Sequence, residues 1–166
     1  MVVRNEGATV LFVLATLFLS GGPALAEREL PYFAALRNGV TNVRVGPGVT
    51  YPVHWVFHQR GWPVEVVNRF GNWRRIRDNT GDVGWVHSAL LTVRRTAAIR
   101  TRDGQNVALR VAPDAEAPIR AYLAAHVLVR PASCTGGWCA VEVTGHGLEG
   151  FVKQARLWGV YPDENF

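Results

Sequence analysis

An internal repeat constrains the fold of this chain more than any other feature of its sequence. Residues 42–53 (NVRVGPGVTYPV) and residues 108–119 (ALRVAPDAEAPI) align with a constant offset of 66 residues. Each segment has an Arg between two aliphatic residues, a Pro three residues after that Arg, and a Pro-aliphatic pair five residues further on. The same offset relates the triplet GWV at residues 84–86 to GFV at residues 150–152. The chain is therefore a tandem duplication of a unit of 66 residues.

Each unit consists of short aliphatic or alternating runs that are separated by turn residues. Gly71-Asn72 and Asn79-Thr80-Gly81-Asp82 are of the hairpin type. No apolar residues recur at helical spacing, and only residues 88–90 could form a single helical turn. Such a unit predicts a small all-β barrel. The expected strands are residues 43–45, 53–56, 64–67, 73–77 and 84–86, followed by 109–111, 121–123, 127–129, 138–143 and 150–152.

The first residues have the pattern of a secretory signal peptide. Residues 10–19 are apolar apart from Thr16, and small residues lead to Ala24-Leu25-Ala26, an A-x-A cleavage site. An uncleaved anchor is the alternative, but a membrane span needs about 20 apolar residues. We expect cleavage after Ala26 and no stable membrane span afterwards. The predicted parts are a signal peptide at 1–26, a first domain at 27–95 and a second domain at 96–166.

The two cysteines, Cys134 and Cys139, lie in the segment CTGGWC, where two glycines can turn the chain back on itself. In an exported chain this spacing favours a structural disulfide across one hairpin. A zinc site with His126 or His146 as further ligands is the alternative, although the spacing matches no common zinc pattern. We therefore expect a structural disulfide, no metal site and no cofactor.

The formal net charge of +5 lies in the first unit. Residues 27–95 contain ten Arg and five acidic residues, whereas residues 96–166 contain seven basic and seven acidic residues. The first unit is therefore the candidate for contact with an acidic partner. Solvated surface arginine without a partner is the alternative.

The motifs resemble those of the bacterial SH3-like (SH3b) domain family. The first unit has N-V-R-x-G-P-G, then an aromatic residue at Tyr51, then G-x-W-x-x-I from Gly71 and G-x-x-G-W-V from Gly81. The second unit looks like a divergent copy, with Ala-Pro-Asp for Gly-Pro-Gly and Phe151 for the last Trp. The resemblance implies a five-stranded, partly open barrel in each unit of a secreted or periplasmic protein. It also implies a binding module, often for cell-wall peptidoglycan or a protein partner.

Candidate ligand-binding residues are those of the first unit that the second unit lacks. Ala117 and Ala121 stand in place of Tyr51 and Trp55, and Trp62 has no clear counterpart. Among the arginines of residues 73–77, none has a basic equivalent in the second unit. The predicted binding residues are Tyr51, Trp55, Trp62, Arg74, Arg75 and Arg77.

Other residues present in both units are expected to be structural. For Trp73 and Trp85 we expect the core, although an aromatic ligand face is the alternative. Arg44 and Arg110 lie between aliphatic residues, where each could pin its own loop through backbone carbonyls or block edge pairing. A bidentate grip on a ligand carboxylate is the alternative for both arginines.

Catalysis is not expected. None of the five histidines matches a histidine of the other unit, and no acid or nucleophile accompanies them at a recognisable spacing. Basic barrels with aromatic faces also bind single-stranded nucleic acid, but export argues against that partner. We predict a non-enzymatic binding module, periplasmic or secreted, that recognises peptidoglycan or a peptide of the cell envelope. The alternative is a periplasmic protein–protein interaction scaffold.

Overall fold

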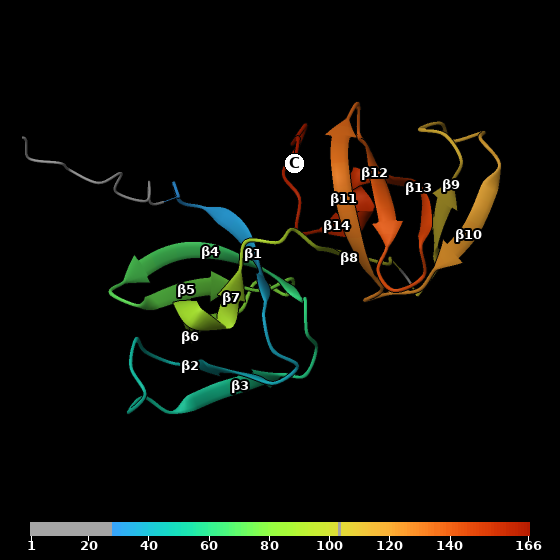
Figure 1. Ribbon diagram of the computed structural model, residues 1–166. Coiled ribbons are helices and arrows are strands. Elements are labelled where there is room, and N and C mark those ends of the chain that lie inside the picture. Colours follow the sequence, from blue (N-terminus) through green and yellow to red (C-terminus); the bar gives the residue numbers. More distant parts are fainter. Residues whose placement is uncertain (1–27, 103) are drawn as a thin grey trace, which may run out of the picture.

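The computed structural model describes residues 28–102 and 104–166, which form two antiparallel sheets of seven strands each (Figure 1). The order across the first sheet is β3-β2-β6-β5-β4-β1-β7, and across the second β10-β9-β13-β12-β11-β8-β14. The strands of the first sheet are β1 (Tyr32–Leu36), β2 (Thr41–Arg44), β3 (Val53–Phe57), β4 (Pro63–Phe70), β5 (Trp73–Arg77), β6 (Val83–His87) and β7 (Leu91–Thr92). Those of the second are β8 (Ala97–Ile99), β9 (Val107–Arg110), β10 (Ile119–Leu123), β11 (Leu128–Thr135), β12 (Trp138–Val143), β13 (Leu148–Lys153) and β14 (Leu157–Trp158).

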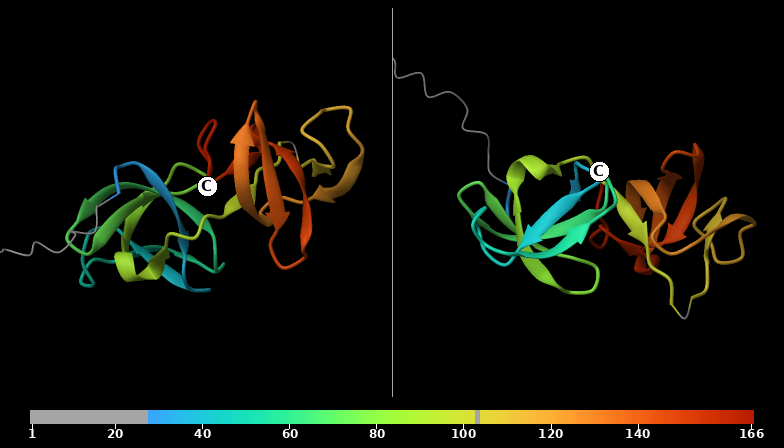
Figure 2. Two further views of the ribbon diagram at one scale, coloured as in Figure 1. Left: turned by 45° about the horizontal axis from the view of Figure 1, so that its top comes forward. Right: turned by 90° about the horizontal axis from the view of Figure 1, so that it is seen from below.

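Both sheets have the same topology, which confirms the prediction of two tandem all-β units. Each curls into a small, partly open barrel, and a single 3₁₀ turn precedes its last strand, η1 (Ser88–Leu90) or η2 (Gln154–Arg156) (Figure 2). The first turn lies at the residues for which it was predicted. The predicted signal peptide at 1–26 lies outside the described residues, and the limits of the two domains stay a prediction. Across the part of the chain that is described, no helix is long and apolar enough to cross a membrane.

The strand β1 and its counterpart β8 were not predicted. β1 pairs with β4 and β7, and β8 pairs with β11 and β14, so each of them joins the last strand to the rest of its barrel. The segments YFAAL and AAI share no motif, and a search for repeated motifs therefore passes over them. Both strands are almost entirely buried.

The glycine that precedes the aromatic residue in GWV and GFV is required by close packing of strands. A Cβ added to Gly84 would lie 2.4 Å from Val43 Cγ1, and one added to Gly150 would lie 2.6 Å from the carbonyl oxygen of Arg110. Strand β6 therefore crosses β2, and β13 crosses β9, at a distance that only glycine permits.

Cys134 and Cys139 form a disulfide, as predicted. They face each other across the hairpin of β11 and β12, and both are buried in the core of the second barrel. The hairpin of β4 and β5 has the same place in the first barrel and contains no cysteine.

The two barrels pack against each other rather than hanging on a free linker. Ala98 of β8 belongs to the buried core of the first barrel, and Leu128 of β11 packs against that core. The indole N–H of Trp158 donates to the Pro63 carbonyl at 2.9 Å, and the edge of Trp158 meets Phe33 with ring centroids 5.1 Å apart. Gly159 has φ +113°, and a Cβ there would lie 2.6 Å from the carbonyl oxygen of Thr96. Apolar and polar contacts thus fix the orientation of the barrels.

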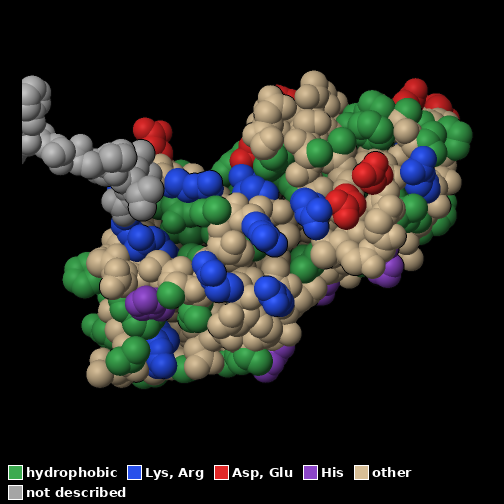
Figure 3. All heavy atoms as spheres, in the orientation of Figure 1, with side chains coloured by type: hydrophobic (Ala, Val, Ile, Leu, Met, Phe, Trp, Pro, Cys, Tyr) green, Lys and Arg blue, Asp and Glu red, His purple; other side chains and the backbone are tan. Residues whose placement is uncertain are grey.

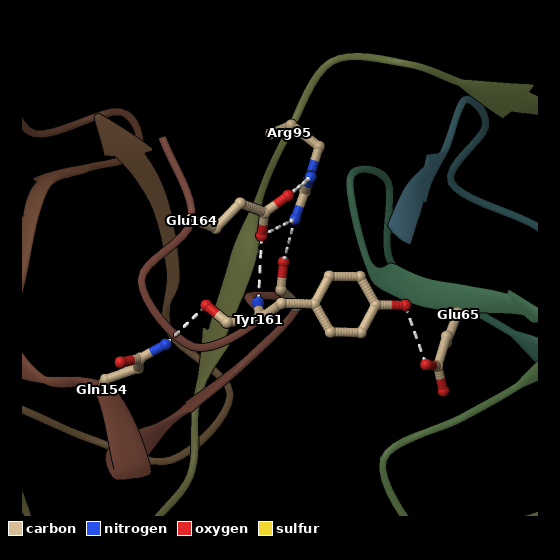
Figure 4. Close-up of polar contacts among 6 residues, drawn as sticks. Glu65, Arg95, Gln154, Tyr161 and Glu164 are labelled. Atoms are coloured by element: carbon tan, nitrogen blue, oxygen red, sulfur yellow. Dashed lines mark hydrogen bonds and ion pairs between the residues drawn. The ribbon is translucent and has the colours of Figure 1, made fainter. Parts of the chain in front are cut away.

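Polar contacts of the C-terminal segment reinforce this junction (Figure 4). The Tyr161 hydroxyl reaches across and donates to Glu65 Oε1 at 2.8 Å. Arg95, in the connection between the barrels, forms an ion pair with Glu164 and donates to the Gly159 carbonyl at 2.7 Å. The C-terminal segment therefore holds the first barrel and the connecting segment together.

Candidate binding site

The predicted residue Tyr51 is exposed, but its ring has a structural role as well. The ring lies against the loop between β2 and β3, where a Cβ on Gly46 would come within 2.4 Å of it. Its side chain remains 46% exposed. Arg44 Nη1 donates to the Tyr51 carbonyl at 2.6 Å, and Arg110 donates to the Ala117 carbonyl in the second barrel. Both arginines therefore pin their own loops, which is the structural role expected for them.

The other two predicted aromatic residues face inward. Trp62 is 6% exposed, packs in the core of the first barrel and meets the ring of His126 edge-on at 5.4 Å. Trp55 is half-buried and packs against the same core beside Gly84. The inward side of the sheet needs large apolar side chains to fill the barrel, and for Trp62 this burial corrects its placement on a ligand surface.

The three predicted arginines of β5 have different surroundings. Arg77 Nε donates to Glu65 Oε2 at 2.8 Å, so its charge is compensated by a carboxylate that is only 4% exposed. Arg74 donates to the carbonyls of Gly71 and Trp73 and supports the adjacent turn. Arg75 is exposed and points outward. Of the three, Arg75 is the one that a ligand reaches most directly.

The carboxylate of Glu65 also explains a shifted tyrosine. Burial raises the pKa of the Tyr161 hydroxyl well above its usual range, and the hydrogen bond to Glu65 and its negative charge add to the effect. Tyr161 therefore keeps its proton and donates it to Glu65 at physiological pH.

Cross-strand pairing places Arg75 in an outward row of cationic and aromatic side chains. Trp85 of β6 lies between Arg44 of β2 and Arg75 of β5, each directly opposite it in the ladder. Opposite residues share one face of a sheet. The inward positions next to them are taken by buried Ile76 and Val86.

A second row on the same face is aromatic. Trp73 lies opposite both Phe70 and His87, and the rings of Trp73 and His87 meet edge-on at 5.5 Å. Phe70 is 65% exposed. We call the two rows the outer face of the first barrel; its residues are Arg44, Phe70, Trp73, Arg75, Trp85 and His87.

The expectation that Trp73 and Trp85 fill the core is therefore wrong. The strands alternate, and because Ile76 and Val86 occupy the core side, the two tryptophans lie half-buried on the other side. The alternation between Trp73 and Arg75 along β5 was a visible signal, since two residues apart on a strand share a face. Phe70 and His87 were missed because nothing in the sequence reveals which residues pair across strands.

Metal chemistry finds no support in the described ranges. Within residues 28–102 and 104–166, no three His, Cys, Asp or Glu side chains gather closely enough to hold a metal ion. The two cysteines that could have served as zinc ligands are joined to each other instead.

Comparison with known proteins identifies the repeated unit. A family model described as bacterial SH3 domain matches residues 38–92 and again residues 103–159. The comparison with curated proteins finds no match.

Two solved structures are similar in part. NlpC2 from Trichomonas vaginalis is 13% identical over 80% of this chain and 49% of that chain, with a TM-score of 0.33. NlpC1 from the same organism is 13% identical over 87% of this chain and 50% of that chain, with a TM-score of 0.32. The chain therefore spans about half the length of these two proteins, and TM-scores of this size do not indicate a shared overall arrangement.

Proposed function

We propose that this chain, which belongs to the bacterial SH3 domain family, is an exported, non-enzymatic binding module that recognises peptidoglycan or a peptide of the cell envelope. The family supports a periplasmic or secreted location and a binding role, and the predicted signal peptide agrees with export. The observation that carries the proposal is the outer face of the first barrel, with Arg75 and Arg44 on either side of Trp85.

The chemistry of the outer face suits such a ligand. Exposed aromatic rings offer flat apolar area on which a sugar or an extended peptide can lie. A guanidinium beside them can hold a carboxylate through two parallel hydrogen bonds. Peptidoglycan presents sugars and carboxylate-bearing peptides together, and a row that alternates arginine and tryptophan offers contacts to both.

Co-sedimentation with purified sacculi tests the proposal. We expect the chain without residues 1–26 to sediment with sacculi at low salt, to be released as salt rises, and to bind sacculi that have been treated with protease. The double variant Phe70→Ser/Arg75→Ser should bind at least about tenfold more weakly, since each lost aromatic or guanidinium contact is worth about 1 kcal/mol or more.

A matched control is available on the second barrel. Tyr122 is 63% exposed and Arg120 is exposed in the same strand, so Arg120→Ser/Tyr122→Ser removes one aromatic residue and one charge as well. This control should bind as the unchanged chain does. Equal losses in the two double variants, or no sedimentation at low salt, would count against the outer face as the site.

A protein-interaction scaffold is the second candidate, and one observation favours it. Four apolar side chains are exposed around the loop between β2 and β3, a feature of protein contact surfaces. They are Val45, Val49, Tyr51 and Val53. Binding to the envelope fraction that disappears when the fraction is treated with protease would support this second candidate over peptidoglycan.

A further inference from the structure

A cleft of about 960 Å³ lies at the junction of the two barrels. It is bordered by the end of β1, by the connection between the barrels and by the first half of β11. On the face seen in Figure 3, Lys and Arg side chains gather over the first barrel and across its junction with the second. A cleft of this size can take several residues of an extended peptide. It shares no residue with the outer face of the first barrel.

Five arginines line the cleft, and no Asp or Glu side chain does so. Two of the five have carboxylate partners, because Arg95 pairs with Glu164 and Arg130 pairs with Glu142 at 2.8 Å. The other three, Arg37, Arg60 and Arg94, have no carboxylate partner among the described residues, and all three are exposed.

The positions of these three charges point to an anionic ligand. Arg37 donates one bond to the Leu91 carbonyl at 3.0 Å, which orients its guanidinium and leaves its other donors available. Like charges around one concave surface repel one another and create a positive potential that attracts anions. Three uncompensated guanidinium groups can each hold a carboxylate in bidentate fashion.

The rest of the lining distinguishes between kinds of anion. Apolar side chains contribute as much to the cleft as the arginines do, and they are Ala35, Leu36, Leu128, Pro131 and Phe166. A phosphate polymer would leave this apolar surface without a partner. A peptide that alternates acidic and aliphatic residues would place its carboxylates on the arginines and its aliphatic side chains on the apolar lining.

We propose that the cleft between the barrels binds an extended acidic peptide with aliphatic residues between its carboxylates. Both barrels contribute to the cleft, with Arg60 from the first and Leu128 from the second. The tandem arrangement thus creates a site that neither barrel has alone.

Fluorescence anisotropy with a labelled hexapeptide of alternating Glu and Leu tests the proposal on the chain without residues 1–26. We expect binding that weakens as salt is raised, and at least tenfold weaker binding of the same peptide with Gln in place of Glu. The double variant Arg60→Ser/Arg94→Ser should lose about tenfold in affinity, and each single variant about threefold.

The matched control is Arg100→Ser/Arg102→Ser, which removes the same charge from exposed arginines outside the cleft. It should lose less than twofold, and Phe70→Ser/Arg75→Ser should also keep its affinity for the peptide. Circular dichroism melting of each variant establishes that it is folded. Since Arg60 and Arg94 make no hydrogen bond or ion pair with described residues, we expect unchanged melting.

Several outcomes would overturn the proposal. They are no binding of the Glu peptide, equal binding of the Gln peptide, or equal losses in the two arginine double variants. Displacement of the Glu peptide by inorganic polyphosphate at a much lower concentration than by unlabelled Glu peptide would assign the cleft to a phosphate polymer. Because the sacculus experiment uses a different face, either proposal can fail without the other.

Discussion

The two barrels carry the same cross-strand ion pair with the charges exchanged. In the first, Glu65 of β4 faces Arg77 of β5, and in the second, Arg130 of β11 faces Glu142 of β12. The Glu65 side chain is 5% exposed, whereas that of Glu142 is 35% exposed. Tyr161 reaches Glu65 from the second barrel, and this contact covers one pair only. Equivalent positions therefore differ in energy because of what covers them.

The outer faces of the barrels differ in a similar way. The row Arg44-Trp85-Arg75 becomes Arg110-Phe151-Ala140 in the second barrel. The loop-pinning arginine and the aromatic residue are kept, and the second arginine is lost. The shared pair serves the fold, and the additional arginine is what gives the first barrel a face suited to an anionic ligand.

The largest effect is expected from the two packed glycines. Gly150→Ala should lower the free energy of unfolding by about 3–4 kcal/mol, since its Cβ would meet a backbone oxygen that cannot move away. Gly84→Ala should cost about 2 kcal/mol, because the nearest atom is a methyl group of Val43 that can rotate in part. Urea unfolding measures both, and the opposite order would contradict this account of the strand crossing.

The exchanged ion pair gives the next prediction. Arg77→Ser should cost about 2 kcal/mol, because it leaves a buried carboxylate with Tyr161 as its remaining side-chain partner. Arg130→Ser should cost less than about 1 kcal/mol, as is usual for an exposed pair. The free energies of unfolding at pH 7 provide the test. Similar costs would show that burial of Glu65 does not distinguish the two pairs.

The contact of Tyr161 with Glu65 predicts a dependence on alkaline pH. The folded state raises the pKa of Tyr161, so the stabilisation is complete below the ordinary tyrosine pKa of about 10 and is lost as pH rises above that value. Tyr161→Phe should cost about 1–2 kcal/mol at pH 7, and the cost should shrink above pH of about 10. Melting of both proteins between pH 7 and 11 measures it, and a pH-independent difference would refute the assignment.

The smallest effect concerns the loop between β2 and β3. Gly46 and Tyr51 are replaced together by Ala112 and Ala117, 66 residues later, because the ring of Tyr51 occupies the space of a Cβ on Gly46. Gly46→Ala should cost about 1 kcal/mol in the presence of Tyr51 and almost nothing together with Tyr51→Ala. A double-mutant cycle by urea unfolding gives the coupling. Additive costs would mean that the two exchanges are independent.

Much of the fold could be predicted because the strands repeat and alternate. β5 was predicted with the bounds that the structure has, and the hairpin staple Cys134–Cys139 is confirmed. The candidate site was harder to predict. The residues present only in the first unit were a sound guide to Arg75, but not to Trp62, which the barrel needs as core. Trp73 and Trp85 were misplaced because size alone suggested the core, while alternation with Ile76 and Val86 decided otherwise.

The sequence by itself determined the duplication, the all-β architecture, the turns and the disulfide, since each depends on residues close together along the chain. The tertiary structure alone decided which side chains stand in one row, because strand pairing joins residues that are distant in sequence. It also decided the burial of Glu65 and the arginine-lined cleft, because both arise where the second barrel packs on the first. A 66-residue repeat specifies two similar barrels, but the surfaces between them depend on contacts that no single repeat contains.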